Sequence, residues 1–322
     1  MDRSEMCFCP DLVTGLTTQA ISNELAEKVF GYSGFAKLLK ARYDQMSELF
    51  RDAPYNDERW NLKEFGCENC VTDNKRDARL RVPREKIACN GNNDNVMRLF
   101  DYNNFGHDMP VWVSYDNDPK AKRIMIVSQD PLRSGDLAGN LYLSTPFGVH
   151  SRDFENGVRN MDSRVRDMLD MFLAKDVCVY LTDYMKFFAV DKPFIRASIT
   201  DGDLWGYKGV FSRVLEAEVK NFNPDLIIIL GRSALDNNLT DTSLINIKPW
   251  NTGYDVQKVD FRIPDDNEVR KGQAVMAVLH PSNASYQTKS IKELIGNVEH
   301  PIIEYYKTIV DHACNYLLGV NQ

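Results

Sequence analysis

Two carboxylates and a histidine directly follow short apolar stretches of this 322-residue sequence. Asp130 comes after the stretch KRIMIVSQ, Asp183 after VCVYLT, and His280 after QAVMAVL. A carboxylate stabilises a developing positive charge and orients a water molecule, and an imidazole hydrogen-bonds an oxygen that gains negative charge. These three side chains therefore suit the cleavage of a polar bond, provided that the fold brings them together.

The apolar stretches alternate with helical patterns from residue 120 onward. Strands are expected at 120–127, 176–181, 225–230 and 273–279, and helices at 162–174, 207–221 and 301–318, with another helix from Ser233. This alternation predicts a parallel sheet covered on both faces, and the ligand of such a sheet lies outside the carboxyl ends of its strands. We therefore expect Asp130, Asp183 and His280 at one edge of the sheet.

The predicted fold is α/β, a three-layer αβα arrangement with a central, mostly parallel four-stranded sheet, formed by residues 120–322. Its last helix should face the core with one apolar stripe, made of Ile302, Ile303, Tyr306, Ile309, Val310 and Ala313. Residues 1–119 show less order, with one or two amphipathic helices between 18 and 53, followed by an asparagine-rich turn and short aromatic stretches. We interpret them as a helical and irregular N-terminal accessory region.

The charge balance and the hydropathy exclude several classes of protein. The sequence has 39 Lys+Arg against 46 Asp+Glu, a net charge of −7. This balance argues against polybasic, non-specific nucleic-acid binding, but it permits a nucleic-acid enzyme whose basic groups are local. No apolar run approaches the ~18 residues that cross a membrane, and the first residues do not resemble a signal peptide. We therefore expect a cytoplasmic globular protein without membrane contact and with reduced cysteines.

The segments at the strand ends resemble motifs of the uracil-DNA glycosylase superfamily. The segment 129–131 (QDP) resembles the water-activating loop of family 1, and 280–282 (HPS) resembles the second catalytic motif. The segment 145–148 (TPFG) resembles the one that carries the base-stacking phenylalanine, 179–186 resembles the base-reading strand, and 225–235 resembles a strand followed by LGxxAL. The resemblance spans the predicted domain to its last helix, and it implies a monofunctional DNA glycosylase of the same fold.

The resemblance also implies a role for each matching residue. Asp130 would stabilise the oxocarbenium-like sugar and position the attacking water, and His280 would hydrogen-bond O2 of the departing base. Phe147 would stack on the base after it is flipped out of the DNA, with Gln129 in the same base-binding set. No lysine replaces Asp130, so we expect no lyase activity, and no nucleotide cofactor is implied.

DNA contacts are expected close to these motifs. Ser282 and Asn283, with nearby backbone N–H groups, would bind phosphates without adding positive charge. Arg133 and Lys186 would add local basic contacts, and further basic residues follow the motifs at Arg152, Lys289 and Lys292. The alternative for the basic residues is an ordinary solvated surface.

Two departures from the family pattern concern the choice of base. Asp183 stands where uracil enzymes have asparagine, and a carboxylate accepts from N4 of cytosine and, when protonated, donates to N3. Leu132 stands where family 1 has a tyrosine that crowds C5 of the base. Both departures favour cytosine or a C5-modified cytosine, such as the glucosylated hydroxymethylcytosine that a phage-defence glycosylase of this superfamily removes. The alternatives are conventional uracil repair and a catalytically silent nucleic-acid-binding module.

Simpler structural roles are open for the same residues. Asp130 and His280 could form turns, and Asp183 could cap a helix or pair with Lys186. Phe147 could belong to the core, with Leu143 taking its place beside the base.

A small-molecule α/β hydrolase is the alternative from another class of enzyme. It would need a nucleophile at a strand end, where Ser128 and Ser233 lack an obvious partner in the sequence. The segment 231–233 also lacks the glycines and the lysine of a phosphate-binding loop, so we assign it to the fold.

The cysteines leave three possibilities for a metal. Cys67 and Cys70 have the spacing of a zinc or iron–sulfur ligand pair. Cys89 would complete a tetrahedral zinc site with His107 or with the cysteines at 7 and 9. A structural zinc, an iron–sulfur cluster and no metal are all open, and catalysis requires no cofactor.

Two further points concern the other cysteines. Relatives that carry an iron–sulfur cluster have cysteines after the base-reading strand, and Phe187 and Phe188 occupy that stretch here, so the cluster is not carried over. Cys178, in a predicted strand, and Cys314, in a predicted helix, are expected in the core.

Overall fold

The described strands form two sheets, one of six strands and one of four. The computed structural model describes residues 80–83, 104–108, 110–113, 121–128, 140–144, 146–149, 160–184, 187–190, 215, 218–220, 222–231, 255–262, 269–281 and 288–320. The helices predicted between 18 and 53 and after Ser233 lie outside these residues.

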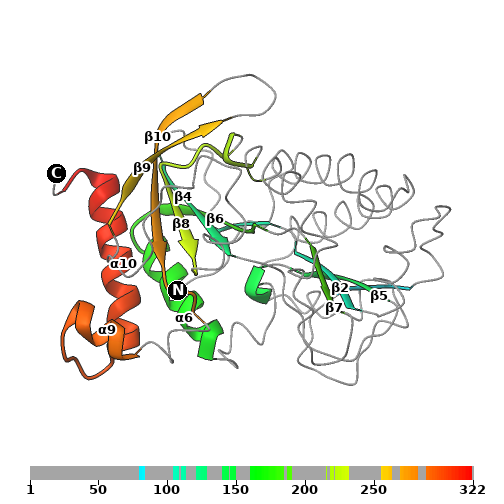
Figure 1. The fold of residues 1–322 in the computed structure, drawn as a ribbon, viewed down its shortest axis with the longest axis horizontal. Coiled ribbons are helices and arrows are strands. Elements are labelled where there is room, and N and C mark those ends of the chain that lie inside the picture. Colours follow the sequence, from blue (N-terminus) through cyan, green and yellow to red (C-terminus); the bar gives the residue numbers. More distant parts are fainter. Residues whose placement is uncertain are drawn as a thin grey trace.

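The six-stranded sheet has the order β3-β6-β4-β8-β10-β9 (Figure 1). Its strands are β3 Val111–Val113, β4 Lys122–Ser128, β6 Val177–Asp183, β8 Leu226–Leu230, β9 Gln257–Arg262 and β10 Val269–Val278. β6, β4, β8 and β10 run parallel to one another, and β3 and β9 add antiparallel edges. The parallel strands are the four that the sequence predicts, so the core of the predicted sheet is confirmed, and the two edge strands are an addition.

The parallel strands are covered on both faces. Every residue of β6 and β8 is buried, which explains their nearly continuous apolar sequences. On one face of β6, the ring of Tyr180 stacks on Phe222, with the ring centroids 5.0 Å apart. Helix α6, Asn160–Leu173, precedes β6 and also contacts it. Burial on both faces agrees with the predicted three-layer arrangement.

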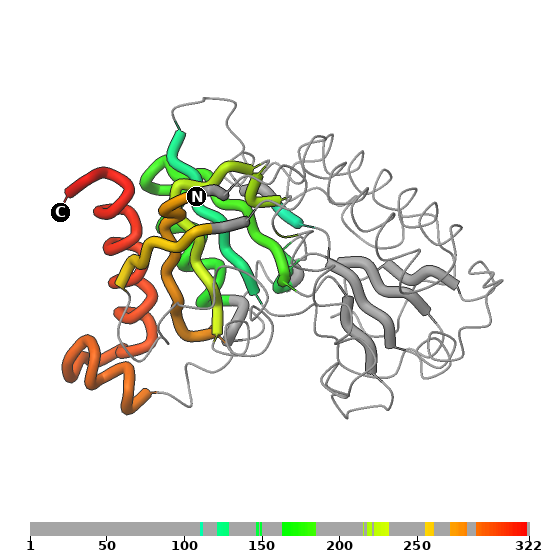
Figure 2. Tube along the Cα trace, turned by 45° about the horizontal axis from the view of Figure 1, so that its top comes forward, coloured from blue at the N-terminus to red at the C-terminus, as the bar shows by residue number. Residues whose placement is uncertain are grey.

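Helix α10 closes the chain over the residues predicted for it, Pro301–Leu318. A proline begins it, and Gly319 ends it in the left-handed conformation with φ of 69°, as helix starts and stops favour. α10 contacts α6 and the short helix α9, Thr288–Ile295. In both views it lies alongside β9 and β10 (Figures 1 and 2).

The buried face of α10 differs from the predicted stripe at Ile303. The side chain of Ile303 is 54% exposed, so its assignment to the stripe was wrong, whereas Tyr305 is buried. The buried residues of α10 are Tyr305, Tyr306, Ile309, Val310, Ala313, Cys314 and Leu317, and Ile303 precedes all of them in the first turn of the helix. Tyr305 therefore joins the core side of the helix in place of Ile303.

The four-stranded sheet has the order β1-β5-β2-β7. Its strands are β1 Leu80–Pro83, β2 Asn104–Asp108, β5 Asn140–Ser144 and β7 Phe187–Val190. The prediction of little regular structure between 54 and 119 was wrong at β1, β2 and β3, because short strands of mixed polarity carry no clear alternation. β3 comes from the predicted accessory region and pairs with β6. The division of the chain between residues 119 and 120 stays a prediction.

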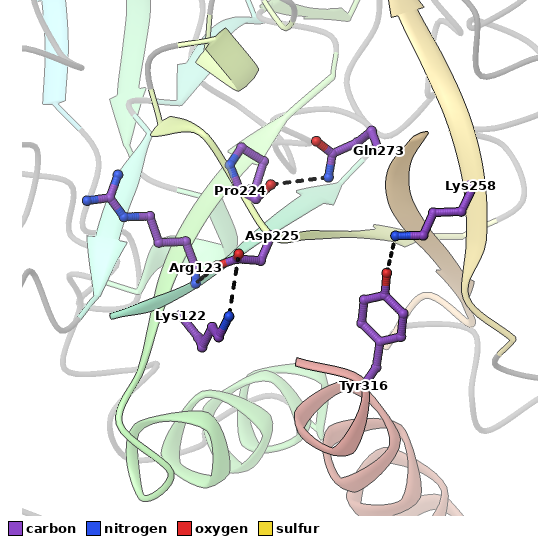
Figure 3. Close-up of polar contacts among 7 residues, drawn as sticks. All are labelled: Lys122, Arg123, Pro224, Asp225, Lys258, Gln273 and Tyr316. Carbon is purple, nitrogen blue, oxygen red and sulfur yellow. Dashed lines mark hydrogen bonds and ion pairs between the residues drawn. The ribbon is translucent and has the colours of Figure 1, made fainter. Parts of the chain in front are cut away.

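Asp225 fastens the amino-terminal ends of β4 and β8 to each other (Figure 3). Its carboxylate accepts the N–H of Arg123 over 2.9 Å, and its own N–H donates to the Arg123 carbonyl over 2.9 Å. Lys122 Nζ lies 3.9 Å from the same carboxylate, but both side chains are about two-fifths exposed, so this ion pair contributes little. Nearby, Gln273 Nε2 donates to the Pro224 carbonyl over 3.2 Å. These contacts hold the end of the sheet that is opposite to the predicted site.

Candidate active site

The carboxyl ends of the four parallel strands bring together the segments that the sequence singled out. β4 ends at Ser128, β6 ends at Asp183, and β8 is followed by Gly231. β10 ends two residues before His280. Because neighbouring parallel strands end at the same edge of a sheet, these four residues form one rim.

Ser128 and Asp183 lie side by side on this rim. They are paired in the register of β4 and β6, so their side chains point to the same face of the sheet. The N–H of Tyr184 donates to the Ser128 carbonyl over 2.9 Å and continues the pairing beyond β6. Both side chains are almost fully buried, with Ser128 and Asp183 each 4% exposed. The carboxylate of Asp183 therefore lies at the inner wall of the rim.

His280 reaches the same rim from β10. Its Nε2 lies 3.4 Å from Ser128 Oγ, a long hydrogen bond whose direction depends on the tautomer of the imidazole. The expectation that Ser128 lacks a partner was therefore wrong, because the sheet joins residues that are 152 positions apart in the chain. His280 itself is half-buried.

Phe147 lies next to His280 in a strained backbone conformation. It belongs to the short 3-10 turn Pro146–Gly148, with φ of 59° and ψ of 3°. A bulky residue in this left-handed region costs about 1–3 kcal/mol and persists only where the surroundings impose it, as at ligand sites. Its ring centroid is 5.7 Å from that of His280, with 32° between the planes. The half-buried ring thus lies beside the imidazole, whereas the side chain of Leu143 lies outside the described residues.

Gly231 allows His280 to approach the end of β8. Its φ of +94° lies in the region that favours glycine, and a Cβ added there would lie 3.0 Å from the Cβ of His280. Its N–H donates to the Val278 carbonyl over 2.8 Å. The segment 231–233 was predicted to serve the fold, and at Gly231 the positive φ and the close approach of His280 explain that role.

Glu218 is a buried carboxylate that the sequence analysis missed. It is 2% exposed and accepts hydrogen bonds from Tyr180 Oη over 3.2 Å and from Thr182 Oγ1 over 3.1 Å. Thr182 and Asp183 are consecutive on β6, so Glu218 lies on the opposite face of the sheet from Asp183. Its signal in the sequence was a glutamate at helical spacing between Leu215 and Phe222, which are both buried.

Several predicted site residues lie outside the described residues. They are Gln129, Asp130, Leu132, Arg133, Lys186, Ser282 and Asn283, together with Cys67, Cys70 and Cys89. Asp130 follows Ser128 by two positions, and Ser282 follows His280 by two, so both belong to segments that begin at the rim. Lys289 and Lys292, on α9, are exposed.

The cysteines that the structure describes are in the core, as predicted. Cys178 and Cys314 are buried and form no disulfide, and burial raises the pKa of the Cys314 thiol. Within the described ranges, no group of three or more His, Cys, Asp and Glu side chains is arranged to hold a metal ion. The cysteines proposed as zinc ligands fall on the remainder of the chain, and His107 lies on β2.

Comparison with known proteins identifies one family. The family model described as the uracil DNA glycosylase superfamily matches residues 115–299, more than half of the chain. The match includes the whole rim from Ser128 to His280 and stops before α10. A search of curated proteins found no match. None of the helices among the described residues is long and apolar enough to span a membrane.

Proposed function

Because the chain belongs to the uracil DNA glycosylase superfamily, we propose that it hydrolyses the N-glycosidic bond of a pyrimidine flipped out of DNA. Members of this superfamily are DNA glycosylases, and the general class follows from the match. The observation that carries the proposal is the position of His280. Its half-buried imidazole lies beside the Phe147 ring and beside the strand end that carries Asp183, so an aromatic face, an imidazole and a carboxylate converge.

The proposed reaction separates charge at the sugar and at the base. The C1′–N bond breaks with its electron pair leaving on the base, and C1′ gains oxocarbenium character. Asp130 stabilises that cation and orients the water whose oxygen adds to C1′, and the water proton passes to Asp130 or to solvent. His280 donates to O2 of the base as negative charge develops there. The base anion then takes up a proton from solvent and leaves as the neutral free pyrimidine, and DNA keeps an abasic site.

Phe147 supplies the surface on which the flipped base stacks. Chemistry on a base requires that the base leave the helical stack, and aromatic contacts recover part of the cost. The left-handed backbone at Phe147 supports this role, because strain of this kind concentrates at ligand sites. Gln129 completes the base-binding set.

Asp183 selects the base in this proposal. Its carboxyl is buried at the rim. A protonated Asp183 donates to N3 of cytosine and accepts from N4, whereas the ionised form would face O4 of uracil with an acceptor. Leu132 in place of the tyrosine leaves a different wall near C5. The substrate is therefore cytosine or a C5-modified cytosine, such as the glucosylated hydroxymethylcytosine of phage DNA.

In this proposal few residues contact the DNA, and they lie near the pocket, because a net charge of −7 argues against an extended basic surface that binds phosphates. Ser282 and Asn283 bind phosphates through hydroxyl, amide and backbone N–H groups. Arg133 and Lys186 add positive charge near the pocket. Binding should therefore depend weakly on salt compared with a polybasic protein, since few phosphates are neutralised.

Oligonucleotide cleavage tests the proposal directly. Single- and double-stranded oligonucleotides carrying uracil, cytosine, hydroxymethylcytosine or glucosylated hydroxymethylcytosine are incubated with the protein, and abasic sites are scored. Cleavage of a cytosine derivative that Asp130→Asn abolishes supports the proposal. Cleavage of uracil alone makes the chain a conventional repair enzyme, and binding of these oligonucleotides without cleavage makes it a silent binding module.

The contact between Ser128 and His280 supports one rival function. A serine hydroxyl 3.4 Å from an imidazole Nε2 is the nucleophile-and-base pair of an acyl hydrolase. Such an enzyme would react with a fluorophosphonate probe at Ser128 and would hydrolyse p-nitrophenyl acetate. Loss of both signals in Ser128→Ala, with no cleavage of any oligonucleotide by the original protein, would favour this rival.

A further inference from the structure

Two adjacent tyrosines of α10 hold the peptide that precedes His280. The N–H of Leu279 donates to Tyr305 Oη over 3.0 Å, and Tyr306 Oη donates to the Leu279 carbonyl over 3.1 Å. Leu279 is 3% exposed and each tyrosine is 2% exposed. The two rings meet edge to face, with centroids 5.1 Å apart. Both polar groups of one buried backbone residue are thus satisfied by side chains from one helix.

Arg164 of α6 holds the backbone on the other side of His280. Its guanidinium Nη1 donates to the Pro281 carbonyl over 2.5 Å. The contact links residues that are 117 positions apart. His280 therefore stands between two backbone positions, Leu279 and Pro281, that are fixed by helices packed against each other.

These contacts replace the sheet at a point where the sheet has ended. β10 stops at Val278, so the ladder supplies no bonds to Leu279. A buried backbone N–H or carbonyl without a bond costs about 1–3 kcal/mol, and nearly all such groups are satisfied in folded proteins. Tyrosine hydroxyls meet this need, and because they reach Leu279 from a helix they also fix the direction in which the chain leaves the strand.

The Tyr306 hydroxyl must be protonated to donate to the Leu279 carbonyl. Burial, followed by the neighbouring Tyr305, raises the pKa of the Tyr306 phenol far above its ordinary range, and Arg164 opposes the shift only in part. The hydroxyl therefore keeps its proton across the working range of pH. It remains a donor to the Leu279 carbonyl throughout.

We propose that Tyr305, Tyr306 and Arg164 are positioning residues that aim the imidazole of His280 at the flipped base. We call these three side chains the brace, because they hydrogen-bond the backbone of Leu279 and Pro281. The inference rests on the proposed function, since it assigns His280 to the base. The two tyrosines lie beyond residues 115–299, the range that the family model matches.

The brace should affect the rate of the chemical step more than substrate binding. The donor to a developing anion works only within a narrow range of positions, and a misplacement of about 1 Å can cost about 100-fold in rate. Tyr306→Phe and Tyr305→Phe each remove one bond and leave the rings in place. We expect each to lower kcat by about 10- to 100-fold with KM changed less than about threefold.

The experiment compares these variants with Tyr316→Phe on the same helix. The Tyr316 hydroxyl contacts Lys258 Nζ, near the amino-terminal end of the sheet (Figure 3), so its loss should leave kcat unchanged. Single-turnover rates are measured on the oligonucleotide that the original protein cleaves. Arg164→Gln should also lower kcat, and Arg164→Lys should recover part of the loss, because lysine restores a donor to Pro281.

Two measurements on the protein without DNA keep the test independent of activity. Hydrogen exchange of the Leu279 amide should accelerate at least about 10-fold in Tyr305→Phe and stay unchanged in Tyr316→Phe. The ¹⁵N and ¹H signals of the His280 ring, assigned with His280→Gln, should move in Tyr305→Phe and in Tyr306→Phe.

The outcomes separate the inference from the function on which it rests. Unchanged kcat in the three brace variants, or an equal loss in Tyr316→Phe, overturns the brace. If the original protein cleaves no oligonucleotide, the proposed function fails, and the two measurements without DNA then decide the brace. An unchanged His280 ring with an unchanged Leu279 exchange rate overturns it in that case also.

Discussion

Ser128 Oγ lies 3.4 Å from Nε2 of His280, the side chain that the proposed mechanism assigns to the base. In the structure the imidazole thus faces a hydroxyl at the end of β4. An incoming base O2 would share or replace this contact. Ser128 either assists the glycosylase reaction or, in the rival function, is the nucleophile of an acyl hydrolase. One substitution at Ser128 distinguishes these two roles.

Ser128→Ala should lower the glycosylase rate only about two- to tenfold. The contact is long, and a neutral hydrogen bond of this kind contributes about 0.5–1.5 kcal/mol. The measurement is the single-turnover rate of abasic-site formation at saturating oligonucleotide. Asp130→Asn serves as the inactive reference on the same substrate. Complete loss of oligonucleotide cleavage in Ser128→Ala would show that the hydroxyl takes a direct part in the reaction.

Gly231→Ala should both destabilise the fold and disturb His280. The φ of +94° strains any other residue, and the new Cβ would lie 3.0 Å from His280 Cβ. We expect a loss of about 1–3 kcal/mol in the free energy of unfolding and at least about a tenfold loss of rate. Urea unfolding and single-turnover cleavage measure the two effects.

Gly272→Ala provides the matched control for this substitution. Gly272 also has a positive φ, of +66°, but a Cβ added there meets nothing within 4 Å. It should therefore show the cost of backbone strain, about 1 kcal/mol, with full activity. Equal losses of activity in the two variants would mean that the contact with His280 has no influence on the reaction.

Asp183→Asn should shift the preference of the enzyme from cytosine-type bases toward uracil. An asparagine amide offers one donor and one acceptor, which match O4 and N3–H of uracil. The substitution keeps the size of a side chain that is 4% exposed, so the fold should tolerate it. The ratio of kcat/KM for uracil and cytosine oligonucleotides should rise at least about 100-fold, the scale of discrimination that a buried polar pair provides. An unchanged ratio would remove Asp183 from base selection.

The parallel core was predictable because its strands are buried on both faces. β8, with the sequence LIIIL, reads as a strand without help from neighbours. β9 was missed because Val259 is its one buried side chain among those described, and an edge strand with one covered face gives a weak pattern. α9 was missed for a similar reason, since Ile291 is its one buried residue.

The sequence predicted which residues lie on the rim, but it did not predict the contacts between their side chains. The order of apolar strands brought Asp183 and His280 to one edge, because parallel strands end together. Helical spacing marked Tyr306 as a core residue, but periodicity cannot show that its hydroxyl meets Leu279, 27 positions away. The same holds for Ser128 and His280, since contacts of this kind depend on the crossing of elements and not on local pattern.

Alkaline pH should destabilise the protein through Tyr306. Burial raises the pKa of this phenol above its ordinary value near 10, so above pH ~10 the unfolded chain loses a proton that the folded chain keeps. The unfolded state then binds fewer protons, and the free energy of unfolding falls as the pH rises, by up to about 1.4 kcal/mol per pH unit for this group. Below pH ~10 the contribution is fully present. Urea unfolding between pH 8 and 11 measures the slope.

Tyr306→Phe should flatten this alkaline slope, because the variant has no phenol to ionise in either state. Cys314→Ala should act at lower pH, since burial also raises the pKa of that thiol and an ordinary thiol ionises near pH 8.5 in the unfolded chain. The two variants together therefore separate the contributions of the phenol and the thiol to the pH dependence. A Tyr306→Phe protein that keeps the original slope above pH 10 would mean that the phenol ionises as readily in the folded state as in the unfolded chain. In that case the hydroxyl could not remain the donor to Leu279 at high pH, and the brace would open before the protein unfolds.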